Sequence, residues 1–167
     1  MLYLNKINKI LLSACTFLLF SCSQSFDVYA DGHLEEISKT AGDVSVKMIV
    51  SKLSNNKNCK AKKSWRWGTE RICPKNIVDR LEVKYKGKNV FVSLSAFSDL
   101  SNVRNLDIEY DKKETSSEYF VILSGGDAAF SYTAKLKFKG VTLQEKLVRH
   151  GEFPDKAWEK TIYGYNL

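Results

Sequence analysis

Apolar and polar side chains alternate one by one in several short stretches between residues 44 and 143, with turn residues between the stretches. Period-two alternation is typical of β-strands that bury one face, and residues 44–50 and 130–138 show it most clearly. The continuous apolar run at 119–123 predicts a strand that is covered on both faces. A doubly wound α/β fold is excluded because the chain has no long helical stretches between these strands.

Lysine, glycine and asparagine at 86–89 and the Lys139-Gly140 dipeptide are typical of tight turns, and each predicts a β-hairpin. The pattern at 95–103 indicates a short helix or turn, and Pro154 followed by Asp155 predicts a second helix over 154–160. We therefore expect a mainly-β domain. It would be an antiparallel β-sandwich or part-closed barrel of about six to seven strands, with one or two short helices.

The first residues of the chain form a targeting segment. Lys6 and Lys9 precede an apolar run at 10–20, which is the pattern of a secretory signal. The run is too short to span a bilayer, which needs about 20 apolar residues. Export also implies an oxidising compartment for the mature protein.

Two cleavage sites remain open. The residues at 19–22 resemble the lipobox of bacterial lipoproteins, and this resemblance implies cleavage before a lipid-modified Cys22. With serine at position 23, it further implies an outer-membrane lipoprotein that faces the periplasm of a Gram-negative cell. Alternatively, the small residues around position 30 predict cleavage there and a soluble periplasmic protein.

The predicted organisation follows from these sites. We expect a signal peptide at 1–21 (or 1–30), a linker at 22–43 and a single β-rich domain at 44–167. A chain of this length can bury a core without a metal or several disulfides.

Two cysteines belong to the expected domain, Cys59 and Cys73. In an oxidising compartment an even pair of cysteines normally forms a disulfide, so we predict a Cys59–Cys73 bond. Two cysteines and two histidines at these spacings do not match a zinc-site pattern. We expect no metal and no cofactor.

The region 31–167 carries 24 basic and 18 acidic residues, a net charge of +6. This balance favours an anionic neighbour such as an acidic protein, an envelope glycan or lipid headgroups. We expect no nucleic-acid partner, because an exported domain rarely meets nucleic acid. Basic residues such as Lys135, Lys137 and Lys139 are spread along the chain, which predicts a solvated basic surface.

Trp65, Arg66 and Trp67 form the first candidate binding segment. Two tryptophans beside an arginine, on a loop closed by a disulfide, would give a rigid aromatic platform for a sugar or a protein. The structural alternative is that one tryptophan covers the open end of the β core.

Ser124, Gly125, Gly126 and Asp127 form the second candidate segment. Glycines permit a tight turn with positive φ, or a close backbone approach to a partner. With Tyr132 downstream, the segment is similar to the serine- and glycine-containing loop of bacterial inhibitors of C-type lysozyme. That resemblance implies a loop that enters the cleft of an enzyme.

His150, Glu152 and Asp155 are the only candidates for acid–base catalysis that we identify. A histidine near carboxylates can act as a general base with an orienting partner. At a strand end it more often forms hydrogen bonds within a loop. The chain contains no HExxH, GxSxG, Walker or EF-hand motif.

These features favour a non-enzymatic cell-envelope lipoprotein domain that binds a macromolecular partner, either a protein or an envelope glycan. An inhibitor or immunity-type protein against a secreted hydrolase or toxin is one form of this hypothesis. The alternative is a cell-wall hydrolase centred on His150. In general character the chain resembles small exported lipoproteins and periplasmic proteins of Gram-negative bacteria.

Overall fold

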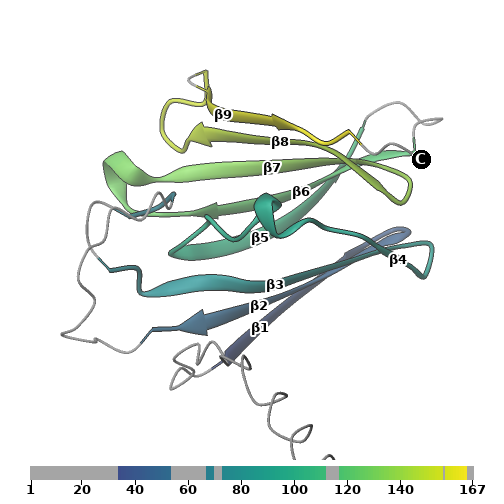
Figure 1. Ribbon diagram of the computed structural model, residues 1–167, viewed down its shortest axis with the longest axis horizontal. Coiled ribbons are helices and arrows are strands. Elements are labelled where there is room, and N and C mark those ends of the chain that lie inside the picture. The colour runs from purple at the N-terminus through teal and green to yellow at the C-terminus, as the bar shows by residue number, and fades with distance from the viewer. Residues whose placement is uncertain (1–33, 54–66, 70–72, 112–116, 156, 165–167) are drawn as a thin grey trace, which may run out of the picture.

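The computed structural model describes residues 34–53, 67–69, 73–111, 117–155 and 157–164. Within these ranges the chain forms two antiparallel sheets, with strand orders β1-β2-β3-β4 and β5-β6-β7-β8-β9 (Figure 1). The predicted mainly-β fold is confirmed, as a two-sheet sandwich rather than a closed barrel. The elements are β1 (Leu34–Ala41), β2 (Val44–Lys52), β3 (Asn76–Tyr85), β4 (Lys88–Val90), η1 (Leu94–Ala96), β5 (Val103–Tyr110), β6 (Glu118–Gly125), η2 (Ala128–Phe130), β7 (Tyr132–Lys139), β8 (Thr142–His150) and β9 (Ala157–Ile162).

The four-stranded sheet begins earlier than expected, inside the predicted linker at 22–43. β1 pairs with β2 over its whole length, from Leu34 opposite Ser51 to Ala41 opposite Val44. β1 is an edge strand with mostly exposed residues, and its apolar signal in the sequence is therefore weak. Among the described residues no helix is long and apolar enough to cross a membrane.

The prediction of a helix at 154–160 is wrong, because this part of the chain contains β9. β9 pairs with β8 as an antiparallel strand, and Trp158 forms a bulge between the pairs made by Ala157 and Glu159. A bulge places an extra residue on one strand and changes the direction of the side chains that follow. Trp158 and Glu159 are both partly buried, although they are adjacent in the sequence.

Strict alternation also fails on β8. Gln144 is an extra residue between the Phe138–Leu143 pair and the Lys137–Glu145 pair. Because this bulge reverses the phase of the strand, Leu143 and Lys146 are both fully buried although they are three residues apart. The position of Lys146 inside the protein follows from this bulge.

The sandwich has two different ends. Tight turns at 42–43, 86–87 and 140–141 lie together at one end, which we call the turn end (Figure 1). At the turn between β3 and β4 both loop residues have positive φ, as in a type I′ turn. The β2–β3, β6–β7 and β8–β9 connections and the start of β1 lie at the opposite end, which we call the loop end.

Candidate functional site

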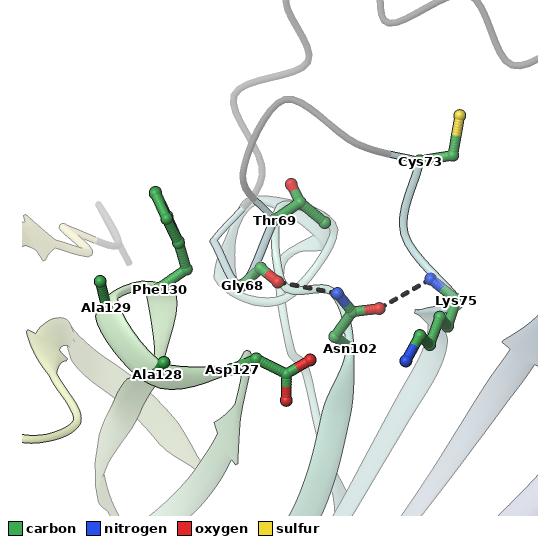
Figure 2. Close-up of a pocket in the computed structure, with 9 residues that line it drawn as sticks. All are labelled: Gly68, Thr69, Cys73, Lys75, Asn102, Asp127, Ala128, Ala129 and Phe130. Carbon is green, nitrogen blue, oxygen red and sulfur yellow. Dashed lines mark hydrogen bonds between the residues drawn. The ribbon is translucent and has the colours of Figure 1, made fainter.

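A pocket of about 290 Å³ opens at the loop end. Figure 2 shows that its walls come from the chain around Gly68, the start of β3 and the η2 turn. The lining residues are Gly68, Thr69, Cys73, Lys75, Asn102, Asp127, Ala128, Ala129 and Phe130.

Backbone hydrogen bonds hold Trp67 against the chain that precedes β5. The Trp67 N–H donates to the Asp99 carbonyl over 2.8 Å. The Trp67 carbonyl accepts from both the N–H and the Oγ of Ser101, over 3.0 and 2.6 Å. Ser101 is fully buried, so these bonds are shielded from water.

Asn102 joins two walls of the pocket. Its Nδ2 donates to the Gly68 carbonyl, and its Oδ1 accepts from the Lys75 N–H, each over 2.7 Å (Figure 2). Both polar ends of this side chain are therefore used inside the protein. Asn102 positions its neighbours, and Thr69 and Lys75 are further polar residues of the pocket lining.

Gly68 and Gly126 lie where the chain after Trp67 meets the loop before the η2 turn, and both have positive φ. A Cβ on Gly126 would lie 2.2 Å from the Phe130 carbonyl oxygen and 3.0 Å from the Gly68 Cα. A Cβ on Gly68 would lie 2.4 Å from the Ser101 carbonyl oxygen. These glycines therefore permit close contacts between main-chain segments inside the fold.

The η2 turn supplies an apolar wall. Phe130 is about one-third exposed, and Ala128 and Ala129 are exposed beside it. Asp127 lies at the edge of this wall and forms an ion pair with Arg104. The pocket thus combines an apolar side with a polar side that carries Lys75 and Asp127.

Behind this pocket, the buried ammonium group of Lys146 connects the chain before β5 to strand β9. Lys146 is fully buried, and its Nζ lies 2.7 and 2.6 Å from the two carboxylate oxygens of Asp99. The same Nζ lies 3.3 Å from Glu159 Oε1 and 3.4 Å from the Ser95 carbonyl oxygen. A buried charge of this kind is tolerated only when it is paired and hydrogen-bonded.

Glu159 extends the network to Trp67. Its Oε2 accepts from Trp67 Nε1 over 2.9 Å, and its Oε1 accepts from Thr161 Oγ1 over 2.8 Å. The Trp67 ring stacks on Trp158, with ring centroids 5.2 Å apart. Trp67 is therefore partly buried and fixed in place, as in the structural alternative for this tryptophan.

The network also changes the acidity of Glu159. Burial raises the pKa of this carboxyl group, but hydrogen bonds from Thr161 and Trp67 and the charge of Lys146 outweigh the effect of burial. The net result is a pKa below the usual glutamate value. Glu159 therefore remains ionised and stays a partner for Lys146 at neutral pH.

His150 uses both ring nitrogens inside the protein. Nδ1 accepts from the N–H groups of Glu152 and Phe153, over 3.0 and 3.1 Å. Nε2 lies 3.2 Å from the Ala129 carbonyl oxygen, which can only accept, so we assign the proton to Nε2. His150 thus locks the β8–β9 loop against the η2 turn and has no lone pair left for a substrate. Its contact with Glu152 goes through the main chain, and both Glu152 and Asp155 are exposed.

Only some of the residues predicted for partner binding, lipidation and the disulfide lie in the described part of the chain, and few of those line the pocket. Trp65, Arg66, Cys59 and Cys22 lie outside the described residues, and so the predicted disulfide and lipidation stay predictions. Of the second segment, Gly125 and Gly126 are buried and only Asp127 lines the pocket. Ser124 pairs with Thr133 within the sheet, away from the pocket lining.

The residues behind the resemblance to lysozyme inhibitors are also part of the packed structure. Tyr132 is 1% exposed, and its hydroxyl donates to the Ser101 carbonyl over 3.1 Å. Burial raises the pKa of this phenol strongly. Gly125 is buried too, so neither residue is presented to a partner.

Sequence reasoning missed Lys75, Asn102 and Phe130, which lie on three separate segments. Of these three residues, only Asn102 has a feature that its residue type suggests: a positive φ, which asparagine tolerates. No cluster of three or more histidine, cysteine, aspartate or glutamate side chains within the described ranges could hold a metal ion. No family model, no curated protein and no solved structure matches the chain.

We expect Lys146→Met to lower the free energy of unfolding by about 3 kcal/mol, because Asp99 and Glu159 would lose their shared cation. The value lies at the lower end of the range for buried pairs, since both carboxylates are roughly one-quarter exposed. Urea denaturation measures the change. A triple variant with Asp99→Asn and Glu159→Gln as well should recover much of the loss. A triple variant less stable than Lys146→Met would contradict this account.

The lowered pKa of Glu159 predicts a loss of stability in acid. The carboxyl group binds its proton more readily in the unfolded chain, so its contribution is present above about pH 4.5. This contribution is lost as the pH falls from there through the lowered pKa of the folded state. Glu159→Gln should make the decrease of unfolding free energy below about pH 4.5 shallower. An unchanged slope in urea titrations at several pH values would refute this role.

Proposed function

We propose that this chain is a non-enzymatic, exported binding domain that recognises a macromolecular partner in the cell envelope through its loop end. The observation that carries the proposal is the meeting of the two candidate segments. The chain that follows Trp67 and the glycine loop at 124–127 are far apart in the sequence. Their ends touch at Gly68 and Gly126, and both contribute to one pocket.

The pocket has the chemistry of a recognition site. Thr69 and Lys75 line one side, and the apolar surface of the η2 turn lines the other. Binding sites commonly combine an apolar wall with a few polar groups that orient the ligand. A volume of about 290 Å³ suits a side chain or headgroup of a larger partner.

Backbone strain also gathers at this pocket. Of three non-glycine residues with positive φ in the described ranges, Asn102 and Ala128 both line it, with φ of 50° and 42°. Such conformations cost energy and persist where the surrounding structure imposes them, which is frequent at binding sites. The strain supports a pocket that is formed before the partner arrives.

Attachment to the envelope is part of the same proposal. Lipidation of Cys22 would tether the domain to the outer membrane on its periplasmic side, and cleavage near residue 30 would release it as a soluble periplasmic protein. A Cys59–Cys73 disulfide would fix the chain at the rim of the pocket, where Cys73 lies. We propose only the class of partner, which would be a protein, such as a secreted hydrolase or toxin, or an envelope component.

The hydrolase alternative receives no support from the geometry around His150. A general base needs a free lone pair within reach of the proton that it removes. The two N–H groups that point at Nδ1 and the carbonyl at Nε2 leave none on His150.

Site-specific photo-crosslinking in intact cells tests the proposed function. A p-benzoylphenylalanine at position 129 would lie in the pocket, and the same residue at position 141 would lie at the turn end; both native side chains are exposed. We expect a discrete adduct from position 129 and none from position 141. Phe130→Ala should reduce the adduct about tenfold, since a buried aromatic contact is worth roughly 1.5–3 kcal/mol. No adduct from position 129, or equal adducts from both positions, would refute the proposal.

A further inference from the structure

Basic side chains on the outer faces of the two sheets are neutralised by acidic neighbours. Lys47 pairs with Glu36 on the first sheet at 2.7 Å, and Lys137 pairs with Glu118 on the second sheet at 2.9 Å. Exposed pairs of this kind place opposite charges side by side and therefore give little field at a distance. An attraction for an anionic partner has to come from basic residues that lack such a neighbour.

Three such lysines lie at the turn end. Lys84, Lys88 and Lys139 are exposed, and none of them forms an ion pair within the described part of the chain. A fourth lysine there, Lys86, pairs with Asp43 at 3.7 Å. The turn end therefore presents three ammonium groups that no carboxylate of the described residues neutralises.

The balance of unpaired charge differs between the two ends of the sandwich. At the turn end, Asp111 is the carboxylate among the described residues that remains to oppose the three lysines. At the loop end, Lys75 and Arg149 also lack an ion pair in the described ranges, but Glu152 and Asp155 match them in number. Within the part of the chain that the structure describes, the excess of positive charge thus lies at the turn end.

A contact between the two sheets brings these lysines onto one surface. An isolated β-bridge joins Phe91, just after β4, to Thr142, the first residue of β8. Thr142 pairs with Lys139 across the β7–β8 turn, and Lys88 lies three residues before Phe91. The β3–β4 and β7–β8 hairpins therefore lie side by side at the turn end (Figure 1).

Exposed apolar side chains accompany the lysines. Phe91 and Val141 both adjoin Thr142, one across the bridge and one along the chain, and they are 71% and 47% exposed. The turns on either side of them project from the fold, because a Cβ on Gly87 or Gly140 would have no atom within 4 Å. The surface thus combines free positive charge, exposed apolar side chains and two projecting turns.

From these observations we infer that the turn end docks on an anionic phospholipid surface. The three unpaired lysines would lie at the headgroup phosphates, and Phe91 and Val141 would enter the interfacial layer. Basic residues with apolar or aromatic neighbours bind anionic membranes through electrostatic attraction and apolar burial together.

The kind of basic residue favours lipid over a protein partner. Every described basic residue at the turn end is a lysine. Protein–protein interfaces are depleted in lysine and enriched in arginine, whose planar fork matches a carboxylate. A lysine is a compact point charge on a flexible stem, which suits the many interchangeable phosphates of a bilayer surface.

The inference goes beyond the proposed function and does not depend on the pocket. β2, with 9 residues, separates the two ends by about 30 Å. Docking by the turn end would therefore leave the pocket at the loop end facing away from the bilayer. The stretch from Cys22 to Leu34 can span about 40 Å when extended, so a lipid on Cys22 permits this orientation.

The experiment uses the mature protein with p-benzoylphenylalanine at position 141 or 129, mixed with vesicles and irradiated. One set of vesicles contains phosphatidylglycerol and phosphatidylethanolamine, and the other contains phosphatidylcholine alone. We expect about tenfold more lipid adduct from position 141 than from position 129 on the anionic vesicles, because each lysine near an anionic surface strengthens binding about fivefold. The excess should disappear on the neutral vesicles and at high NaCl concentration, because salt screens surface charge.

A matched pair of variants tests the residue assignment. Lys88→Gln should lower the lipid adduct from position 141 about fivefold. Arg149→Gln removes an equally exposed and unpaired charge at the loop end, and it should leave this adduct unchanged. Circular dichroism establishes that both variants keep the fold.

Three results would overturn the inference: no excess at position 141, an equal excess on neutral vesicles, or an equal loss in the two variants. A phospholipid joined to position 141 adds far less mass than a protein partner, so in cells it is distinct from the protein adduct expected at position 129. A protein adduct at position 129 without a lipid adduct at position 141 would overturn this inference alone. The reverse result would support this inference and refute the proposed function.

Discussion

A single buried ammonium group organises the loop end of this sandwich. Lys146 Nζ binds Asp99, which precedes β5, and Glu159, which lies on β9. Glu159 in turn accepts from the Trp67 indole. These side-chain contacts connect the chain before β5, strand β9 and the chain at Trp67, in addition to the backbone hydrogen bonds between Trp67 and the chain before β5. Because an unpaired charge in this position would be costly, the chain gains stability only when all three segments are in place. The pocket depends on this arrangement, since Trp67 fixes the chain that forms its wall.

The pocket is a consequence of close backbone contact more than of large side chains. A methyl group on Gly68 would collide with the Ser101 carbonyl oxygen, and a methyl group on Gly126 would collide with the Phe130 carbonyl oxygen. Asn102 then connects the Gly68 carbonyl with the Lys75 N–H. The rim of the pocket is lined by Lys75, Thr69 and the apolar side of the η2 turn. Such a preformed rim lowers the entropy cost of binding, which supports recognition as the role of this end.

The sequence predicted the sandwich because burial along β2 and β7 follows simple alternation. It did not predict β1, an edge strand on which only Ile37 and Ala41 reach the core. It also could not predict the inward position of Lys146, because that depends on the bulge at Gln144. Packing of Trp67 on the core was one of two alternatives open from the sequence, but its partner Glu159 lies 92 residues away and has no local signal. Bulges and long-range polar contacts leave no periodic trace in a sequence, and the candidate site is built mainly from such contacts.

The central claim is that Lys146 and Trp67 act through the same carboxylate. A double-mutant cycle with Lys146→Met and Trp67→Phe, measured by urea denaturation, tests it most directly. Phenylalanine keeps an aromatic ring to stack on Trp158 and removes only the indole N–H that binds Glu159. The account predicts a coupling free energy of about 0.5–3 kcal/mol, the range for residues in one hydrogen-bonded network. A coupling free energy within error of zero would show that the two residues act independently, and would contradict the account.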